Sequence, residues 1–441
     1  MKARTWALSL ILGMGLLGSL SAFDWGGTID NSTTPTFFIG PQTTDLLQED
    51  TLALWLSTAL GKQLRLLVQA SYTFTNDRLL FINFDIAQVE GQFLVGTQRP
   101  SLLTFTAGRF PLAEFSSRVL DASVDGLRAE WSNSFLNATA AVAFTGLQLG
   151  LQKNTVSEPL ELAPESSVSM TWADQQSDSD TAPPRLIELV ELYFPEFFAR
   201  QDFRVVLLSQ QDLRGQDNLI QEGDTFFTSG SGGRLHSGYF GLGISGPIPA
   251  GLYYDLFGFV ETGKTLSYIN GIYEYAWMLS VLFGGGIRYY REDWLSSRAE
   301  LRFLFASGDA DYTVQFIEGN TDGLATSFVP ITRSDLALEF SPSLGNLSVI
   351  ELGYSLKPVN ILQTGVTGYL FLRPTTGEIS DTRISGDSLY LGSEIDTIAR
   401  IRLFSDLGAA LSLGLFLPGN ALGTAAGEPE FRGRLEISFS F

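Results

Sequence analysis

Charged side chains recur at every second residue in several segments of this chain. Near the C-terminus, for example, Arg432, Arg434 and Glu436 alternate with apolar residues. Successive side chains of a β-strand point to opposite faces, so such residues would share one polar face. The charged positions that we expect on a polar face lining an interior are Arg65, Arg128, Arg288, Arg298, Glu300, Arg302, Glu394, Asp396, Arg400, Arg402, Arg432, Arg434 and Glu436.

Two interpretations of these charged residues are open. Arginines gathered at a constriction would order anionic or polyhydroxylated solutes. Alternatively, arginine and glutamate on neighbouring strands would pair and stabilise a polar interior. Acidic and basic positions interleave almost evenly along the chain, which favours pairing. Their inward placement is the firmer prediction, because charged side chains that face lipid cost free energy.

The composition excludes several other chemistries. The 441 residues include no cysteine and one histidine, so disulfides and Cys/His zinc sites lack their residues, and we predict no cofactor. With 28 basic and 48 acidic residues, the net charge of −20 repels nucleic acid. The sole histidine, His236, precedes Ser237, and neighbours in a strand point to opposite faces. A nucleophile needs a base within reach, so we do not predict an enzyme.

The N-terminus has the pattern of a secretory signal peptide. Lys2 and Arg4 precede an apolar run over residues 6–20, and the small residues Ser21 and Ala22 follow it. An uncleaved membrane anchor is the alternative, but the run is short for a span and contains several glycines. We therefore predict a signal peptide over residues 1–22 and an exported domain over residues 23–441.

Apolar and polar residues alternate through most of the exported domain, most clearly over 63–74, 298–305, 391–403 and 430–441. A soluble β-sandwich and a transmembrane barrel would both show this pattern. The barrel is favoured because the segments run to ten residues or more and because very short and very long connections alternate. We predict an all-β fold, a single antiparallel transmembrane β-barrel with short periplasmic turns and long extracellular loops.

Eighteen candidate strands can be counted, with 16 as the alternative because two segments alternate poorly. An even number leaves both termini on the periplasmic side. The apolar piece over 334–340 would break this parity, so we assign it to an extracellular loop that folds inward. The candidates cover residues 23–31, 50–60, 63–75, 79–91, 101–110, 123–132, 134–147, 185–194, 202–213, 235–247, 250–263, 272–291, 295–308, 346–357, 362–374, 388–404, 407–417 and 430–441.

The last strand resembles the C-terminal signal by which diderm bacteria insert barrels through the outer-membrane assembly machinery. Its apolar positions are Leu435, Ile437, Phe439 and Phe441, and it ends on an aromatic residue. Four further motifs occur along the chain: Gly108-Arg109-Phe110, Asp125-Gly126-Leu127, Ala306-Ser307-Gly308-Asp309, and Leu391-Gly392-Ser393-Glu394-Ile395-Asp396 followed by Pro418-Gly419. They resemble porin-like barrels, and the alginate-export-like group of 18-stranded barrels is the most similar in shape. This resemblance implies a passive outer-membrane channel for polar or anionic solutes.

We therefore predict a porin-like channel in the bacterial outer membrane, with membrane lipid, the assembly machinery and small polar solutes as partners. A barrel of about eight strands is filled by its own side chains, whereas 16 to 18 strands leave an aqueous channel. A transporter of hydrophobic molecules such as fatty acids is one alternative, and residues 32–49 are its only early candidate for a plug. A closed surface adhesin is another, with loops 148–184 and 309–345 as its contact elements. The pattern predicts no oligomeric state.

Overall fold

The computed structural model describes most of residues 23–441. The described residues are 23–38, 45–76, 81–96, 100–147, 182, 184–213, 219–222, 225–228, 235–249, 251–269, 272–310, 324–377, 379–380, 383–384, 386–422 and 428–441, with only the backbone described at 38, 45, 81, 219–222, 225–228, 266–269, 272–274 and 276. The predicted signal peptide and most of the segment 148–184 lie outside these residues.

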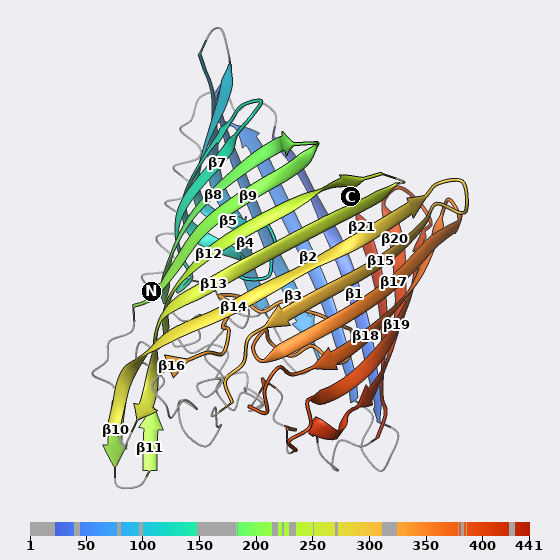
Figure 1. Cartoon of the computed structure of the whole chain (residues 1–441). Helices are drawn as coiled ribbons and strands as arrows, with labels where there is room; N and C mark the ends of the chain where they lie inside the picture. Colours follow the sequence, from blue (N-terminus) through green and yellow to red (C-terminus); the bar gives the residue numbers. More distant parts are fainter. Residues whose placement is uncertain are drawn as a thin grey trace, which may run out of the picture.

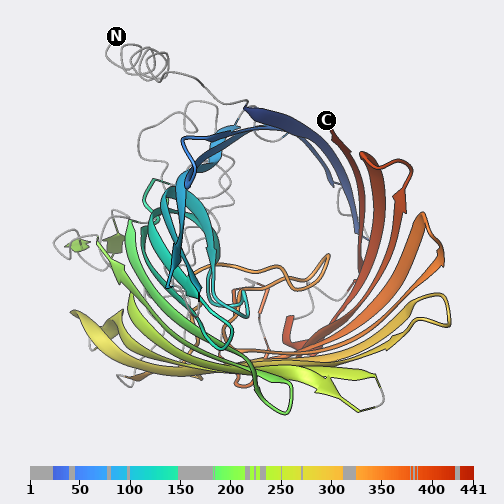
Figure 2. The ribbon, with the colours of Figure 1, turned by 90° about the horizontal axis from the view of Figure 1, so that it is seen from above.

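A closed antiparallel barrel of 18 strands makes up the described fold (Figures 1 and 2). Each wall strand pairs with the next, and the last strand pairs with the first. The strands are β1 (Asp24–Phe38), β2 (Asp45–Ala59), β3 (Leu64–Thr75), β4 (Phe81–Val95), β5 (Ser101–Ala113), β6 (Asp121–Ser132), β7 (Asn137–Phe144), β8 (Arg185–Phe198), β9 (Gln201–Asp212), β12 (Leu235–Ile248), β13 (Leu252–Ile269), β14 (Ile272–Arg291), β15 (Ser297–Ala306), β17 (Leu347–Val359), β18 (Leu362–Leu372), β19 (Tyr390–Arg402), β20 (Leu407–Pro418) and β21 (Glu430–Ser440).

The predicted all-β barrel and its larger strand number are confirmed, since each of the eighteen predicted segments overlaps one wall strand. The segment 334–340 contains no strand and lies inside the barrel, as predicted. The expectation of a spare segment over 32–49 is wrong. Its residues extend β1 to Phe38 and start β2 at Asp45, because their polar side chains continue the pairing between the two strands.

The two ends of the barrel differ in their connections. At the end that holds both termini, hereafter the short-turn end, neighbouring strands are joined by a few residues, such as 60–63, 199–200 and 403–406. The other end, hereafter the long-loop end, carries the small hairpin of β10 (Leu219–Glu222) and β11 (Thr225–Thr228). In the described part of the chain, no helix has the length and apolar character needed to span a membrane.

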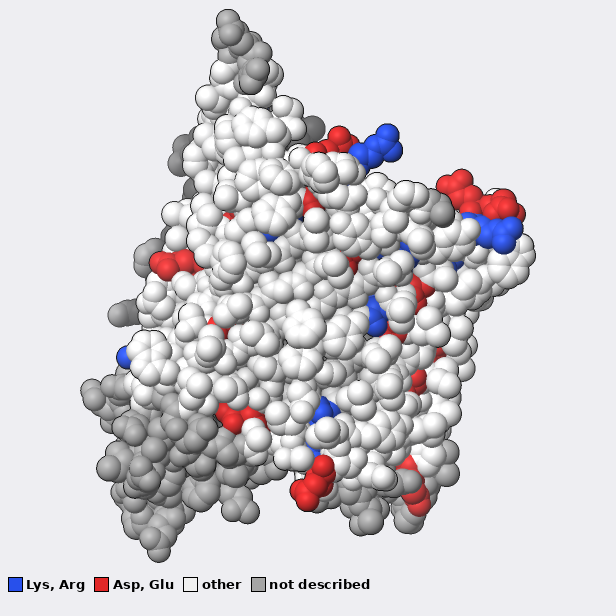
Figure 3. Space-filling view, viewed as in Figure 1, with Lys and Arg blue, Asp and Glu red and all other residues white. Residues whose placement is uncertain are grey.

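Apolar side chains cover the outside of the wall. In β21, Leu435, Ile437 and Phe439 are exposed on the outer face, while Arg432 and Arg434 point inward. On the face shown in Figure 3, most of the surface between the two ends is uncharged. An apolar band around a closed sheet is what a lipid bilayer requires of a spanning barrel.

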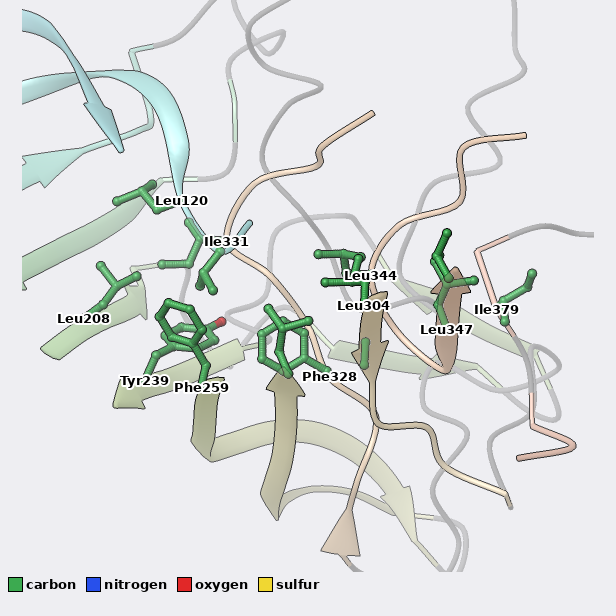
Figure 4. Packing of buried hydrophobic residues seen from close by; sticks show 14 of the residues in the cluster. Leu120, Leu208, Tyr239, Phe259, Leu304, Phe328, Ile331, Leu344, Leu347 and Ile379 are labelled. Carbon is green, nitrogen blue, oxygen red and sulfur yellow. The ribbon is translucent and has the colours of Figure 1, made fainter. Parts of the chain in front are cut away.

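The hydrophobic core lies inside the barrel, near the long-loop end, rather than between two layers of sheet. It forms where the inward loops pack against the wall. Figure 4 shows the cluster extending from Leu120 and Ile331 through Phe328 to Leu347 and Ile379. All five of these side chains are at most 2% exposed. The core therefore fixes the inward loops against the wall of the barrel. It does not fill the whole lumen.

Arg373 fixes the connection between β18 and β19. Its guanidinium is buried and donates to the carbonyls of Thr376 and Gly377 at 2.8 Å, of Ser388 at 2.9 Å and of Gly386. A planar fork of five N–H donors suits such a set of acceptors, and a lysine ammonium cannot reach all of them.

We therefore expect Arg373→Met to lower the free energy of unfolding by about 3 kcal/mol, because buried carbonyls lose charge-assisted partners. Urea unfolding in detergent, with limited proteolysis of the β18–β19 connection, measures this loss. Arg373→Lys should recover only part of it. Equal stability of the Met variant and the parent would contradict this role for Arg373.

Candidate functional site: the constricted lumen

Two segments of the long-loop end fold into the lumen and meet there. We call residues 114–120, between β5 and β6, the inner loop, and residues 324–346, between β15 and β17, the strap (Figure 2). The backbone N–H groups of Ile331 and Thr332 donate to the carbonyl of Val119 at 2.8 and 3.0 Å. The Thr332 hydroxyl accepts from the N–H of Asp121 at 2.8 Å. The two segments thus form one crossbridge inside the barrel.

Glu114 organises the inner loop. Its carboxylate accepts the backbone N–H groups of Ser116, Arg118 and Val119 at 2.5, 2.8 and 3.0 Å. Burial raises the pKa of Glu114 above the usual carboxyl range, and these N–H donors oppose that shift. A loop closed around its own carboxylate keeps a fixed shape, so it presents Arg118 to the lumen in one position.

The strap is tied to the wall at β12, β13 and β14. The Tyr239 hydroxyl donates to the carbonyl of Val329 at 2.6 Å, and the Val329 N–H donates to Glu261 Oε2 at 2.9 Å. The same carboxylate oxygen accepts from Ser280 at 2.6 Å. Strand β16 (Leu324–Ala325) adds a short parallel pairing with β14. Both backbone groups of Val329 are therefore satisfied by inward side chains of the wall.

The other half of the strap is tied to β19. The N–H groups of Glu339 and Phe340 donate to the two carboxylate oxygens of Glu394 at 2.7 and 2.8 Å, and the N–H of Leu338 donates to Asp396 Oδ2 at 3.0 Å. Hydrogen bonds to a charged acceptor are stronger than neutral ones. Glu394 and Asp396 thus hold three consecutive backbone N–H groups of the strap.

Aromatic packing reinforces this attachment. The ring of Phe340 stacks on Phe416 of β20 with centroids 4.5 Å apart and meets Phe371 of β18 edge-on at 5.0 Å. All three side chains are buried. The strap therefore crosses the lumen with one half fixed to β12–β14 and the other to β18–β20.

A first cavity of 480 Å³ lies between the inner loop, the strap and the wall of β9 and β12–β18. Arg204 lies 4.6 Å above the ring of Tyr193, and Arg288 donates to Asp255 at 2.5 Å. The charged side chains lining this cavity are Arg118, Arg204, Asp255, Arg288, Arg302 and Glu351. These are four cations and two anions, and two acids just outside the lining, Glu191 and Glu300, lie 4.0 Å from Arg204 and 2.7 Å from Arg302.

A second cavity of 670 Å³ lies between the strap and the wall of β15 and β17–β21. It shares Leu336, Glu351 and Tyr369 with the first. Ion pairs line it: Arg302 contacts Glu300 at 2.7 Å, and Arg432 of the wall contacts Glu339 of the strap at 2.7 Å. Its charged side chains are Arg298, Glu300, Asp335, Glu339, Glu351, Asp396, Arg400, Arg432, Arg434 and Glu436.

The structure brings most of the predicted lining residues together at these two cavities. They are Arg288, Arg298, Glu300, Arg302, Asp396, Arg400, Arg432, Arg434 and Glu436. Glu394 lies beside them but is occupied by the strap. Several of the cations contact acids, which matches the interpretation that arginine and glutamate pair across strands. The excess of cations in the lining of the first cavity matches the interpretation that arginines at a constriction order anionic solutes.

Three predicted residues lie elsewhere. Arg65 donates to the Ser57 hydroxyl at 2.7 Å beside a separate cavity near the short-turn end. Arg128 contacts Glu130 at 3.2 Å on the wall of β6. Arg402 lies at the end of β19, donates to a carbonyl of the turn that follows and lines a third cavity nearer the short-turn end. Period-two spacing gives the face of a strand but not the height along the barrel, which explains the separation of these three residues from the first two cavities.

Four charged residues of the two cavities, Arg118, Asp255, Asp335 and Glu339, were not predicted as lining residues. Arg118 lies in the inner loop, and Asp335 and Glu339 lie in the strap, where no alternation marks a face. Asp255 lies in β13, where alternation does place it inward with Tyr253. The inward positions on either side of it, Tyr253 and Phe257, carry no charge, so the segment shows no charged face.

The motifs that resemble porins have structural roles at the long-loop end. Gly108 has a φ of +114°, and a Cβ there would lie 2.1 Å from the carbonyl oxygen of Ala87. Its neighbour Arg109 pairs with Asp125 of the second motif at 2.6 Å. Asp309 of the third motif accepts the N–H of Thr326 in the strap at 2.9 Å. These motifs therefore fix strand ends and the start of the strap.

Comparisons with known proteins give a fold but no sequence family. No family model and no curated protein matches the chain. A solved structure of Pseudomonas aeruginosa OccK2 (OpdF) in complex with glucuronate is similar, with a TM-score of 0.56 and 12% identity over 96% of this chain and 99% of that one. The outer membrane protein opdK of the same organism gives 0.56 and 10% over 96% and 100%, and OccK11 (OpdR) gives 0.53 and 11% over 95% and 96%. The predicted porin-like barrel is thereby confirmed as a fold.

Proposed function

We propose that this chain is a passive channel of the bacterial outer membrane for small polar or charged solutes. One observation carries this proposal: polar cavities follow one another through the lumen. The second cavity shares Gln363, Arg400 and Glu436 with a third cavity of 770 Å³. The third cavity is lined by turn residues of the short-turn end, such as Asn360 and Asp406. A solute that passes the strap thus meets polar side chains along its whole path.

The charges along this path indicate a preference among solutes. The first cavity, whose lining holds more cations than anions, is the smallest of the three by volume and is lined in part by the inner loop. Arg118 and Arg204 there can bind a carboxylate, and Tyr253 and Tyr369 can contact hydroxyl groups or a sugar ring. The solved structure of OccK2 with glucuronate shows such a solute in a barrel of this fold. We therefore propose small organic anions, such as sugar acids, as preferred solutes.

The alternatives are less consistent with the structure. A fatty-acid transporter needs a plug, and the segment considered for it belongs to β1 and β2. An adhesin needs outward loops, yet the strap, which is most of the described part of 309–345, points into the lumen. His236 lies on the outer face with its ring 5.6 Å from Tyr275, while Ser237 is buried on the inner side. We propose no enzymatic role.

Solute uptake into proteoliposomes tests this proposal. Vesicles containing the folded chain of residues 23–441 are expected to swell in isotonic glucuronate faster than in a neutral sugar of similar size, and slowest in a dicationic amine. Protein-free vesicles provide the control. Swelling no faster than that of protein-free vesicles in every solute would contradict a passive channel. Equal rates for all three solutes would contradict the anion preference alone.

We propose that the C-terminal strand also carries the assembly signal. Phe441 pairs with Gly27 through both backbone groups, and its ring lies 6.4 Å from Trp25 and 6.2 Å from Phe439. Deleting Phe441 is expected to reduce the folded, membrane-inserted fraction strongly, because barrel closure and recognition both use this end. Heat-modifiable mobility on gels measures that fraction. Ser440→Ala, on the inner face, should behave as the parent, and normal insertion after deletion would contradict the assignment.

A further inference from the structure

Four polar side chains form a connected cluster on the outer face of β1 and β2. We call Asn31, Thr33, Gln48 and Asp50 the outer polar patch. Asn31 Nδ2 donates to Asp50 Oδ1 at 2.6 Å, and the Thr33 hydroxyl donates to Gln48 Oε1 at 2.7 Å. Gln48 Nε2 lies 3.4 Å from Asp50 Oδ1. The pairing register places Asn31 opposite Asp50 and Thr33 opposite Gln48, so one network joins the two strands.

The direction of the patch follows from strand alternation. Ile29 and Phe37 share its face of β1, and both are exposed on the outside of the barrel. On the neighbouring strand β21, Asn31 pairs with Ile437 and Thr33 with Leu435, two further outer residues. The third cavity borders Asp30, Asn31 and Ser32 alike, so the direction of the patch rests on these exposed apolar neighbours and not on that cavity. By strand alternation the patch side chains point outward with them.

Aromatic residues at both ends of β1 show how deep the patch lies. Trp25 and Phe441 form one pair, 6.4 Å apart, and Phe37 and Phe431 form the other, 5.9 Å apart. Twelve residues separate Trp25 from Phe37, about 40 Å of strand or about 28 Å across a bilayer at a tilt of 45°. This matches the hydrocarbon thickness, and aromatic residues are typical of both interfaces. Asn31 lies midway between the two pairs.

Lipid tails cannot satisfy such a patch. Hydrocarbon offers no hydrogen-bond partner, and a carboxylate at the bilayer centre is costly unless it is paired. Asp50 has no ion pair with any cation in the described part of the chain. The residues around it are apolar and exposed, among them Leu52 and Leu54. Within a bilayer, polar side chains of membrane-spanning segments hydrogen-bond across the contacts between those segments.

We propose that the outer polar patch is where a second copy of this chain docks, patch against patch, around a symmetry axis in the membrane. The patch contains both kinds of partner, because amide hydrogens of Asn31 and Gln48 can donate and Asp50 Oδ2 can accept. A self-complementary set is what a symmetric contact between identical subunits requires. The inference rests on the proposed membrane location but not on the proposed solutes.

Cysteine cross-linking tests this contact, since the chain has no native cysteine. The Thr33→Cys variant in lipid vesicles, treated with a mild oxidant, is expected to form covalent dimers in more than about half of the molecules. Phe283→Cys is the matched control. Phe283 is exposed on the outer face of β14, midway between Trp277 and Tyr289, which places it at similar depth on another side of the barrel. It should remain monomeric.

A second variant tests whether polar pairing holds the two copies together. Adding Asn31→Leu and Asp50→Leu to Thr33→Cys should lower the cross-linked fraction several-fold if polar pairing holds the contact. Equal cross-linking of Thr33→Cys and Phe283→Cys would indicate random collision and overturn the proposal. No cross-linking of Thr33→Cys, in protein that is folded and conducts, would overturn it too, and would leave the channel proposal intact. Protection of that cysteine from maleimide without dimers would indicate a different protein partner.

Discussion

The Glu394→Ala/Asp396→Ala double variant is expected to raise the single-channel conductance about twofold or more, because the strap loses its attachment to β19 and vacates part of the lumen. Three consecutive backbone N–H groups of the strap have these two carboxylates as acceptors. Alanine leaves the N–H groups without partners and removes two negative charges at once. The strap remains attached to β12–β14, so the barrel itself should still close.

Planar-bilayer recording measures this change, and the step noise should increase as the released half of the strap moves. Glu188→Ala is the matched control. Glu188 is an exposed carboxylate on β8 that accepts from Ser209 and touches no strap residue. Its conductance should equal that of the parent. Unchanged conductance of the double variant, in protein that is folded by heat-modifiable mobility, would show that the strap does not depend on these carboxylates.

Arg118→Glu is expected to change the anion-to-cation permeability ratio about twofold or more toward cations. The substitution moves the charge of the first cavity by two units at the tip of the inner loop. No ion pair to Arg118 is found among the described residues, so its charge acts on the lumen rather than on a partner. The backbone N–H of residue 118 still donates to Glu114, which preserves the loop.

The reversal potential in a salt gradient measures this ratio. Arg291→Glu is the control, because Arg291 lies at the short-turn end of β14 and pairs with the exposed Asp293 at 2.9 Å. That substitution changes the net charge equally but leaves the cavities untouched. If both variants shift the reversal potential equally, selectivity depends on the overall charge of the protein and not on the first cavity.

The wall of the barrel could be predicted from the sequence because its physical constraint is local. A strand that separates lipid from water must alternate, as Leu435, Ile437 and Phe439 do against Arg434 and Glu436, and it must be long. The error at 32–49 has the same origin. Residues 32–34 and 48–49 are polar on both faces, because Thr33 and Gln48 of the outer polar patch stand where apolar side chains were expected, so alternation gave no strand.

The interior could be predicted only in part. Alternation placed Glu394 and Asp396 inward but could not show that they bind backbone N–H groups of the strap. Those donors belong to Leu338, Glu339 and Phe340, some 55 residues away, and any residue type supplies a backbone N–H. Long-range contacts of this kind leave no periodic signal, so the constriction could not be predicted from the sequence alone.

Single-channel conductance of the refolded chain of residues 23–441 in a planar bilayer measures whether the lumen is open. We expect uniform steps, with a reversal potential in a salt gradient that indicates a preference for anions. Absence of steps from protein shown to be folded and inserted would contradict an open path through the three cavities.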